Sequence, residues 1–138
     1  MKNIKTFTVQ FFLFLLLIAC KSLINGDDLI GTWKVIEFSA DMPDVSPVLI
    51  QESKDIALST VYTYNSDNSM LRISEVESKA DVGSFELLDE GMRIIMMFDT
   101  EGYNSDEKYE IVSYNGKTMR WKYNYGELGS LVMKLKKQ

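Results

Sequence analysis

The most constraining feature of this sequence is a succession of short β-patterned segments separated by turn residues. The segments are rich in the β-branched and aromatic residues that favour strands, whereas Gly, Asn, Asp and Ser mark the turns. The predicted strands cover residues 29–38, 60–65, 69–77, 82–88, 92–99, 108–114, 118–125 and 131–136. Eight consecutive strands indicate an all-β barrel or sandwich. We expect a small antiparallel up-and-down barrel, because closure removes exposed sheet edges.

Two local patterns support antiparallel pairing. Asn115-Gly116 lies between two alternating segments, and Asn-Gly in that position is a strong hairpin signal. In the segment 118–125, Met119, Trp121 and Tyr123 fall on one face, and polar residues alternate with them. This alternation is typical of strands with one buried face.

One short helix is expected between the first two strands. Both prolines of the chain fall within 41–47, which predicts a loop there. Ser46 can cap a helix and Pro47 can occupy its first position, so a helix over 47–58 is predicted.

The N-terminus has the pattern of a secretory signal peptide. A positively charged start with Lys2 and Lys5 precedes the apolar run 11–18, and the small residue Ala19 follows. The alternative is a retained membrane helix, but the run is shorter than the roughly 20 residues that span a bilayer. We therefore expect residues 1–19 to be a cleaved signal peptide.

The run Leu17-Ile-Ala-Cys20 resembles the lipobox of bacterial lipoproteins. That resemblance implies cleavage before Cys20, lipid attachment to its sulfur, and acylation of the new amino terminus. More than one acyl chain makes such an anchor durable. The expected product is exported and anchored by lipid in the cell envelope, at the outer membrane, with residues 20–28 as lipidated cysteine and tether. The alternative is a stray thiol at the end of a leader.

The expected mature chain is an acidic single domain over residues 29–138. Cleavage removes 19 of 138 residues and leaves 119, enough for one core. Without Lys2 and Lys5 it has 13 basic and 20 acidic residues, a net charge of −7, which argues against nucleic acid as a partner. Cys20 is the only cysteine, so the domain must be stabilised by packing and not by disulfides.

The segment Gly31-Thr32-Trp33 resembles the Gly-x-Trp motif at the start of lipocalin and fatty-acid-binding barrels. In those families the tryptophan closes one end of the barrel and the glycine permits close packing, so Gly31 and Trp33 are the candidate barrel-closing residues. The second lipocalin signature, Thr-Asp-Tyr, has no match in 124–129. Lipocalins also cover the tryptophan with an arginine from the last strand. Here that strand offers Lys134 and Lys136, while Arg72, Arg93 and Arg120 lie elsewhere.

The sequence argues against familiar catalysis. It contains no histidine, which removes the usual general base and the commonest metal ligand. Adjacent acids such as Asp89-Glu90 are more typical of solvated turns than of paired catalytic carboxylates. A loop is predicted over 100–106. The oxygen-rich run 99–106 differs from a calcium loop because Gly102 stands in its fourth place and not its sixth. We expect no enzyme activity, no metal and no cofactor.

The remaining chemistry is an adaptable apolar surface. Methionine and aromatic side chains on one face suit an irregular small hydrophobic ligand. The candidate ligand-binding residues are Trp33, Met92, Ile94, Met96, Met119, Trp121, Tyr123 and Met133. The same residues can instead simply fill an eight-stranded barrel. The first expectation is therefore an anchored lipocalin-like protein that binds a small hydrophobic ligand. The alternative is a packed barrel that binds another envelope protein.

Overall fold

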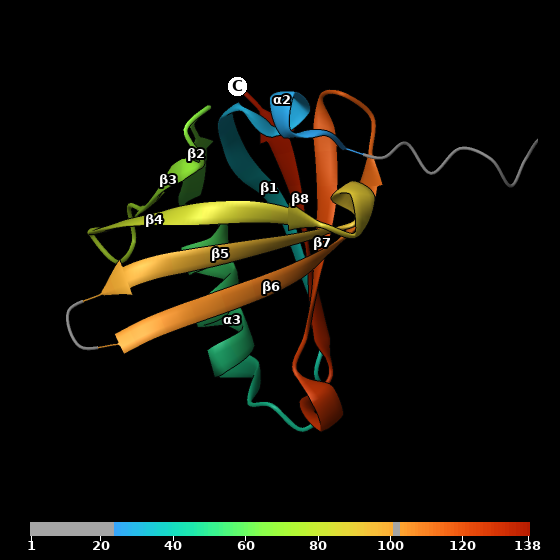
Figure 1. Cartoon of the computed structure of the whole chain (residues 1–138). Coiled ribbons are helices and arrows are strands. Elements are labelled where there is room, and N and C mark those ends of the chain that lie inside the picture. Colours follow the sequence, from blue (N-terminus) through green and yellow to red (C-terminus); the bar gives the residue numbers. More distant parts are fainter. Residues whose placement is uncertain (1–23, 101–102) are drawn as a thin grey trace, which may run out of the picture.

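The computed structural model describes residues 24–100 and 103–138, which form a closed antiparallel barrel of eight strands (Figure 1). Each strand pairs with the next along the chain, and β8 pairs with β1. The strands are β1 (Gly31–Asp41), β2 (Thr60–Tyr64), β3 (Ser69–Ser74), β4 (Lys79–Leu88), β5 (Arg93–Thr100), β6 (Tyr103–Tyr114), β7 (Thr118–Asn124) and β8 (Ser130–Lys137). The predicted up-and-down barrel is confirmed.

The starts of two strands, β6 and β4, differ from the predicted ones. Residues 103–106, expected in a loop, are the first residues of β6, and Asp99 pairs with Asn104 in the β5–β6 ladder. Backbone hydrogen bonds continue a ladder whatever the side chains are, so polar composition alone misplaced this turn. Similarly, β4 begins at Lys79, three residues before the predicted start at Val82.

The helix α3 (Pro47–Leu58) has the predicted bounds, with Pro47 at its start. It lies beside β1, between the end of that strand and the start of β2. Ala57 is buried, whereas Val48 and Leu49 are exposed. Thr60 fastens the helix end to the barrel, because its hydroxyl donates to the Ile56 carbonyl at 2.7 Å. Among the described residues, no helix has the length and apolar character needed to cross a membrane.

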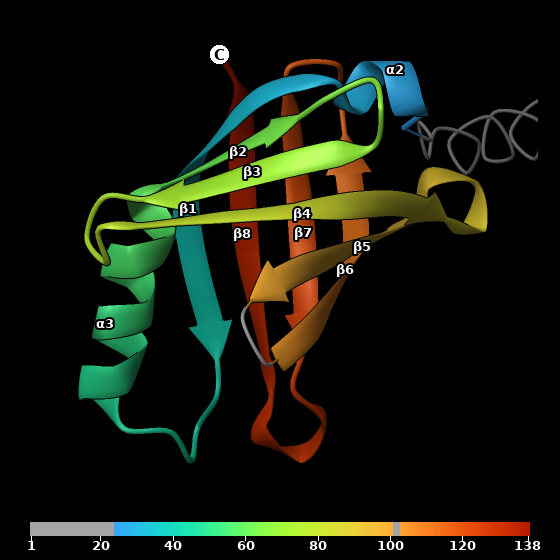
Figure 2. The same ribbon diagram turned by 60° about the vertical axis from the view of Figure 1, so that its left-hand side comes forward.

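The short helix α2 (Gly26–Leu29) covers the end of the barrel where β1 begins, the end at which the C-terminus also lies (Figures 1 and 2). Asn25 caps it, since its side chain accepts a hydrogen bond from the Asp28 amide at 2.9 Å. Ile24 is buried in the core. Thus part of the segment expected as a tether packs on the barrel. Residues 1–19 and Cys20 lie outside the described residues.

Between this end and the middle of the barrel the interior is densely filled. Inward positions alternate along the strands, as in the pattern of buried Thr60, Tyr62 and Tyr64 in β2. The wholly buried side chains include two tryptophans, methionines and aliphatic residues, namely Leu29, Trp33, Ile94, Met96, Met119, Trp121 and Leu135. The opposite half of the barrel, beside α3, has a different chemistry.

Candidate ligand-binding cavity

A cavity of about 370 Å³ opens between α3 and the barrel strands. This volume lies at the lower end of the range typical of small-molecule sites, roughly 300–1,000 Å³. Its wall combines aromatic, apolar, charged and small polar side chains. They are Phe38, Ser53, Ile56, Ala57, Thr60, Tyr62, Arg72, Ser74, Glu77, Lys79, Glu107, Tyr109, Tyr123, Tyr125, Leu131 and Met133.

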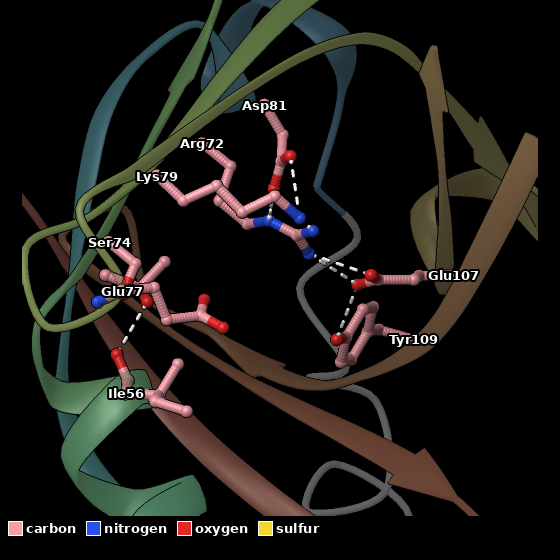
Figure 3. A network of polar contacts seen from close by, with 9 residues as sticks. Ile56, Arg72, Ser74, Glu77, Lys79, Asp81, Glu107 and Tyr109 are labelled. Atoms are coloured by element: carbon pink, nitrogen blue, oxygen red, sulfur yellow. Dashed lines mark hydrogen bonds and ion pairs between the residues drawn. The ribbon is translucent and has the colours of Figure 1, made fainter. Parts of the chain in front are cut away.

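Arg72 is the centre of an ion-pair network in this cavity (Figure 3). Its guanidinium contacts Asp81 through Nη2 at 2.9 Å and Nε at 3.1 Å. Its Nη1 contacts both Glu107 oxygens, at 2.8 and 2.9 Å. The guanidinium carbon also lies 4.0 Å from the centre of the Phe98 ring, a cation–π contact. All five donor directions of arginine lie in one plane, so these contacts hold it in one orientation.

Two further groups extend the network. Lys79 Nζ lies 3.1 Å from Asp81 Oδ1, and the Tyr109 hydroxyl donates to Glu107 Oε2 at 3.0 Å. The side chains of Arg72, Asp81 and Glu107 are 20%, 10% and 24% exposed, so the pairs are shielded from water on most sides. Ion pairs shielded in this way interact more strongly than fully solvated ones.

The network fixes the charge state of its members. Burial opposes the ionised form of Arg72, but hydrogen bonds and charge from Glu107, then Asp81, outweigh it and raise the pKa of Arg72. Burial also opposes the ionised form of Asp81, yet hydrogen bonds from Arg72 and Lys79 lower its pKa. Burial raises the pKa of Tyr62 and Tyr109 above the ordinary range. The site therefore holds charged Arg72 and Asp81 together with neutral phenols at neutral pH.

The aromatic wall is a continuous run of rings. Tyr109 lies 5.1 Å from both Trp121 and Tyr123 between ring centroids, and Tyr123 lies 4.5 Å from Tyr125. The Tyr62 ring meets Trp121 edge-on at 5.0 Å. Trp121 itself is wholly buried behind this wall. Its indole Nε1 has no hydrogen-bond partner within the described part of the chain.

The structure places the predicted ligand-binding residues in two groups. Tyr123 and Met133 line the cavity. The other residues do not line it. Five of them, Trp33, Ile94, Met96, Met119 and Trp121, are wholly buried in the packed interior. Met92 is half-buried in the turn between β4 and β5.

Gly31 and Trp33 lie at the end covered by α2. The Trp33 indole Nε1 donates to the Leu29 carbonyl at 2.8 Å. Lys137 lies over the Trp33 ring, with Nζ 5.4 Å from the ring centroid and 2.8 Å from the Asp28 carbonyl. Gly31 has a φ of +125°, and a Cβ there would lie 3.1 Å from Lys137 Cε. The cation that covers the tryptophan is thus Lys137, which the sequence interpretation did not consider, and Arg72 instead covers Phe98.

Sequence analysis missed the charged members of the cavity for a definable reason. In β3 the inward positions are Met70, Arg72 and Ser74, while Ile73 on the outer face is 42% exposed. The outer face of β3 is therefore the more apolar one in amino-acid composition. For this reason the alternation pattern does not predict that Arg72 points inward. The one signal in the sequence is that Arg72 alternates with Met70, whereas the position of Asp81 opposite Arg72 emerges only from the β3–β4 register.

No cluster of three or more His, Cys, Asp or Glu side chains within residues 24–100 and 103–138 is arranged to hold a metal ion.

No known family model matches the chain, and no curated protein matches it. A solved structure similar to it is that of a DUF4847 family protein from Bacteroides vulgatus. The similarity has a TM-score of 0.49 at 13% sequence identity, and it covers 80% of this chain and 95% of that chain. At this level, the likeness does not define a family for the chain.

Proposed function

We propose that this protein is a lipid-anchored protein of the cell envelope whose lipocalin-like barrel binds one small molecule in the cavity beside α3. The proposal makes it a binding protein and not an enzyme. The observation that carries it is the cavity, because apolar and aromatic walls with a few fixed polar groups are the usual composition of ligand sites.

The cavity wall favours an amphipathic ligand over a purely hydrophobic one. Apolar contacts are available from residues such as Phe38, Leu131 and Met133. On the other side of the cavity, Arg72 and Glu107 present charge held by fixed hydrogen bonds. A ligand with one apolar and one polar end matches both walls, whereas burying charge against a wholly apolar molecule is unfavourable.

Native mass spectrometry tests the binding function. The full chain, expressed with its leader and extracted gently from the envelope, should carry a small-molecule adduct that a denatured and refolded sample has lost. Ser53→Trp should abolish the adduct, because Ser53 is an exposed residue of α3 that lines the cavity. Lys54→Trp is the matched control, since Lys54 is exposed on the same helix and does not line the cavity. An identical adduct on both variants, or none on the wild type, would refute the proposal.

A separate experiment tests the anchor. The lipobox-like run before Cys20 supports thioether-linked lipid on that residue. Metabolic labelling with an alkyne fatty acid should label the wild type, and Cys20→Ser should be unlabelled and leave the membrane fraction. Equal membrane retention and labelling of Cys20→Ser would contradict the lipid anchor without affecting the cavity.

A second candidate function is binding of another envelope protein, and one observation favours it. The outer face of β3 and β4 exposes apolar side chains, with Ile73 42% and Val82 63% exposed. In the β3–β4 ladder, Leu71 pairs with Val82 and Ile73 with Ala80, so these side chains form a continuous strip. Continuous exposed apolar patches mark interaction surfaces more often than scattered residues do.

Cross-linking in intact cells separates the two candidates. A partner-binding module should yield one cross-linked neighbour that disappears in the double variant Ile73→Thr, Val82→Thr. The same variant should keep any adduct held in the cavity, because both side chains point outward. A native protein that runs as a lone monomer without any cross-linked neighbour would exclude this second candidate.

A further inference from the structure

The charges around the cavity balance except for one carboxylate. Arg72, Lys79, Asp81 and Glu107 form a chain of alternating sign in which each cation contacts at least one carboxylate. Two positive and two negative groups leave the chain neutral. Arg72, held by two carboxylates, is thereby already satisfied, so an anionic ligand would have to displace an ion pair to reach it. Lys79 is 50% exposed and is paired with Asp81.

The remaining carboxylate is Glu77, in the turn between β3 and β4. It lines the cavity, and its carboxylate is directed into the space that Arg72, Glu107 and Tyr109 also face (Figure 3). Among the described residues, this carboxylate has no hydrogen bond and no ion pair. Glu77 is exposed to solvent as well as to the cavity, so it offers an unpaired negative charge at the cavity wall that a ligand can reach.

The aromatic wall of the cavity also favours a positively charged ligand. Four tyrosines line the cavity, and the rings of Tyr109, Tyr123 and Tyr125 follow one another at centroid distances of 5.1 and 4.5 Å. Ring faces carry negative potential and attract cations, particularly where water is largely excluded. Because the buried phenols stay neutral, they present π-faces and hydroxyl groups and not competing charges.

We infer that the cavity takes an organic ammonium ion, with its charge beside Glu77 and the tyrosine rings and its small apolar or aromatic body against Phe38, Leu131 and Met133. This inference rests on the proposed binding function and specifies its ligand class. Lys79 and Arg72 do not repel such a ligand strongly, since Asp81 and Glu107 neutralise them.

Three probes of similar shape and different charge test the inference. They are 2-phenylethylammonium, the neutral 2-phenylethanol and the anionic 3-phenylpropanoate, each titrated calorimetrically into the refolded, ligand-free protein at neutral pH. The ammonium should bind at least about tenfold more tightly than either of the others. Glu77→Gln should weaken binding of the ammonium about three- to tenfold and leave that of the alcohol unchanged.

Glu75→Gln is the matched control, because Glu75 is exposed in the same turn but does not line the cavity. This variant should keep wild-type affinity for the ammonium. Equal weakening by both variants would overturn the inference, because it would reflect net charge and not the site. Equal affinity for ammonium and alcohol, or tightest binding of the propanoate, would overturn the ligand class while leaving the binding function standing. Failure of all three to bind would overturn the inference, and the adduct experiment would still decide the binding function independently.

Discussion

The two ends of this barrel are built on opposite principles. At the end covered by α2, Trp33, Ile24 and Leu29 are buried, and Lys137 lies over the Trp33 ring. At the end beside α3, the interior holds Arg72 with two carboxylates around a cavity. Dense apolar packing stabilises a fold, whereas shielded charges and empty space contribute little stability and permit recognition. We therefore expect the end covered by α2, the closed end, to contribute more stability than the end beside α3, the open end, where the proposed binding site lies.

The largest effect on stability is expected from Trp33→Ala. Trp33 is wholly buried, and its indole N–H bonds the Leu29 carbonyl at 2.8 Å. Truncating a buried tryptophan costs about 3–5 kcal/mol through lost burial and the cavity left behind. Urea unfolding should report this loss, with Trp33→Phe as a milder control. A loss below about 1 kcal/mol would show that the closed end is not the stabilising half.

The next largest effect is expected from Arg72→Leu. It leaves Asp81 and Glu107 facing each other without their shared cation. Breaking a fully buried pair costs about 3–5 kcal/mol, and because Arg72 is 20% exposed we expect about 2–3 kcal/mol. Adding Asp81→Asn and Glu107→Gln should recover much of this loss, since no shielded carboxylate is then left unpaired and Lys79, which loses Asp81, is 50% exposed. If the triple variant is no more stable than Arg72→Leu, the charges at the open end are not energetically coupled.

Arg72→Leu should also change the dependence of stability on pH, in a definite direction. The folded-state pKa of Asp81 is lowered by Arg72 and Lys79, despite the opposing effect of burial. Its contribution to stability is therefore present above the unfolded pKa, about 3.9, and is lost as the pH falls through the lower folded value. Arg72→Leu should make the acid limb of the stability–pH curve shallower. Trp33→Ala should leave that slope unchanged, which distinguishes the two ends.

How much of this contrast the sequence can predict depends on the residue. The barrel follows from alternation, the helix over 47–58 follows from its proline start, and the burial of Trp33 is what the resemblance to the Gly-x-Trp motif implies. Ile24 was not predicted in the core, because Leu23-Ile24 is only a two-residue apolar step in a polar stretch, too short to show a strand or helix pattern. Arg72 was not predicted in the cavity, because the sequence of β3 alone does not show which of its faces points inward. The pairing of β3 with β2 and β4 determines this. Cross-strand geometry, which no local pattern contains, decides such cases.

A smaller effect is expected from Gly91→Ala, which probes how Ile24 is held at the closed end. Gly91 has a φ of +83°, and a Cβ there would overlap the Ile24 carbonyl oxygen. We expect a loss of about 1–2 kcal/mol from backbone strain and displacement of the 24–29 segment. Hydrogen exchange should show faster opening at Leu29 and Ile30, whose amides bond the carbonyls of Asn25 and Gly26. Gly126→Ala, with a φ of +67° but open space around its Cβ, is the control for strain alone. Equal hydrogen exchange in the Gly91→Ala and Gly126→Ala variants would show that Gly91 does not hold the 24–29 segment in place.

The smallest effect on stability is expected from Met133→Leu, at the boundary between the two ends. Met133 is 4% exposed, pairs with Trp121 across the β7–β8 ladder and lines the cavity. A volume-conserving swap costs less than about 1.5 kcal/mol, because the core repacks around a similar shape. Branching at Cγ nevertheless changes the cavity floor, so affinity for the phenyl probes should change by more than stability does. If affinity is unchanged while stability falls as far as in Arg72→Leu, Met133 belongs to the packed end, and the boundary of the binding half lies nearer α3.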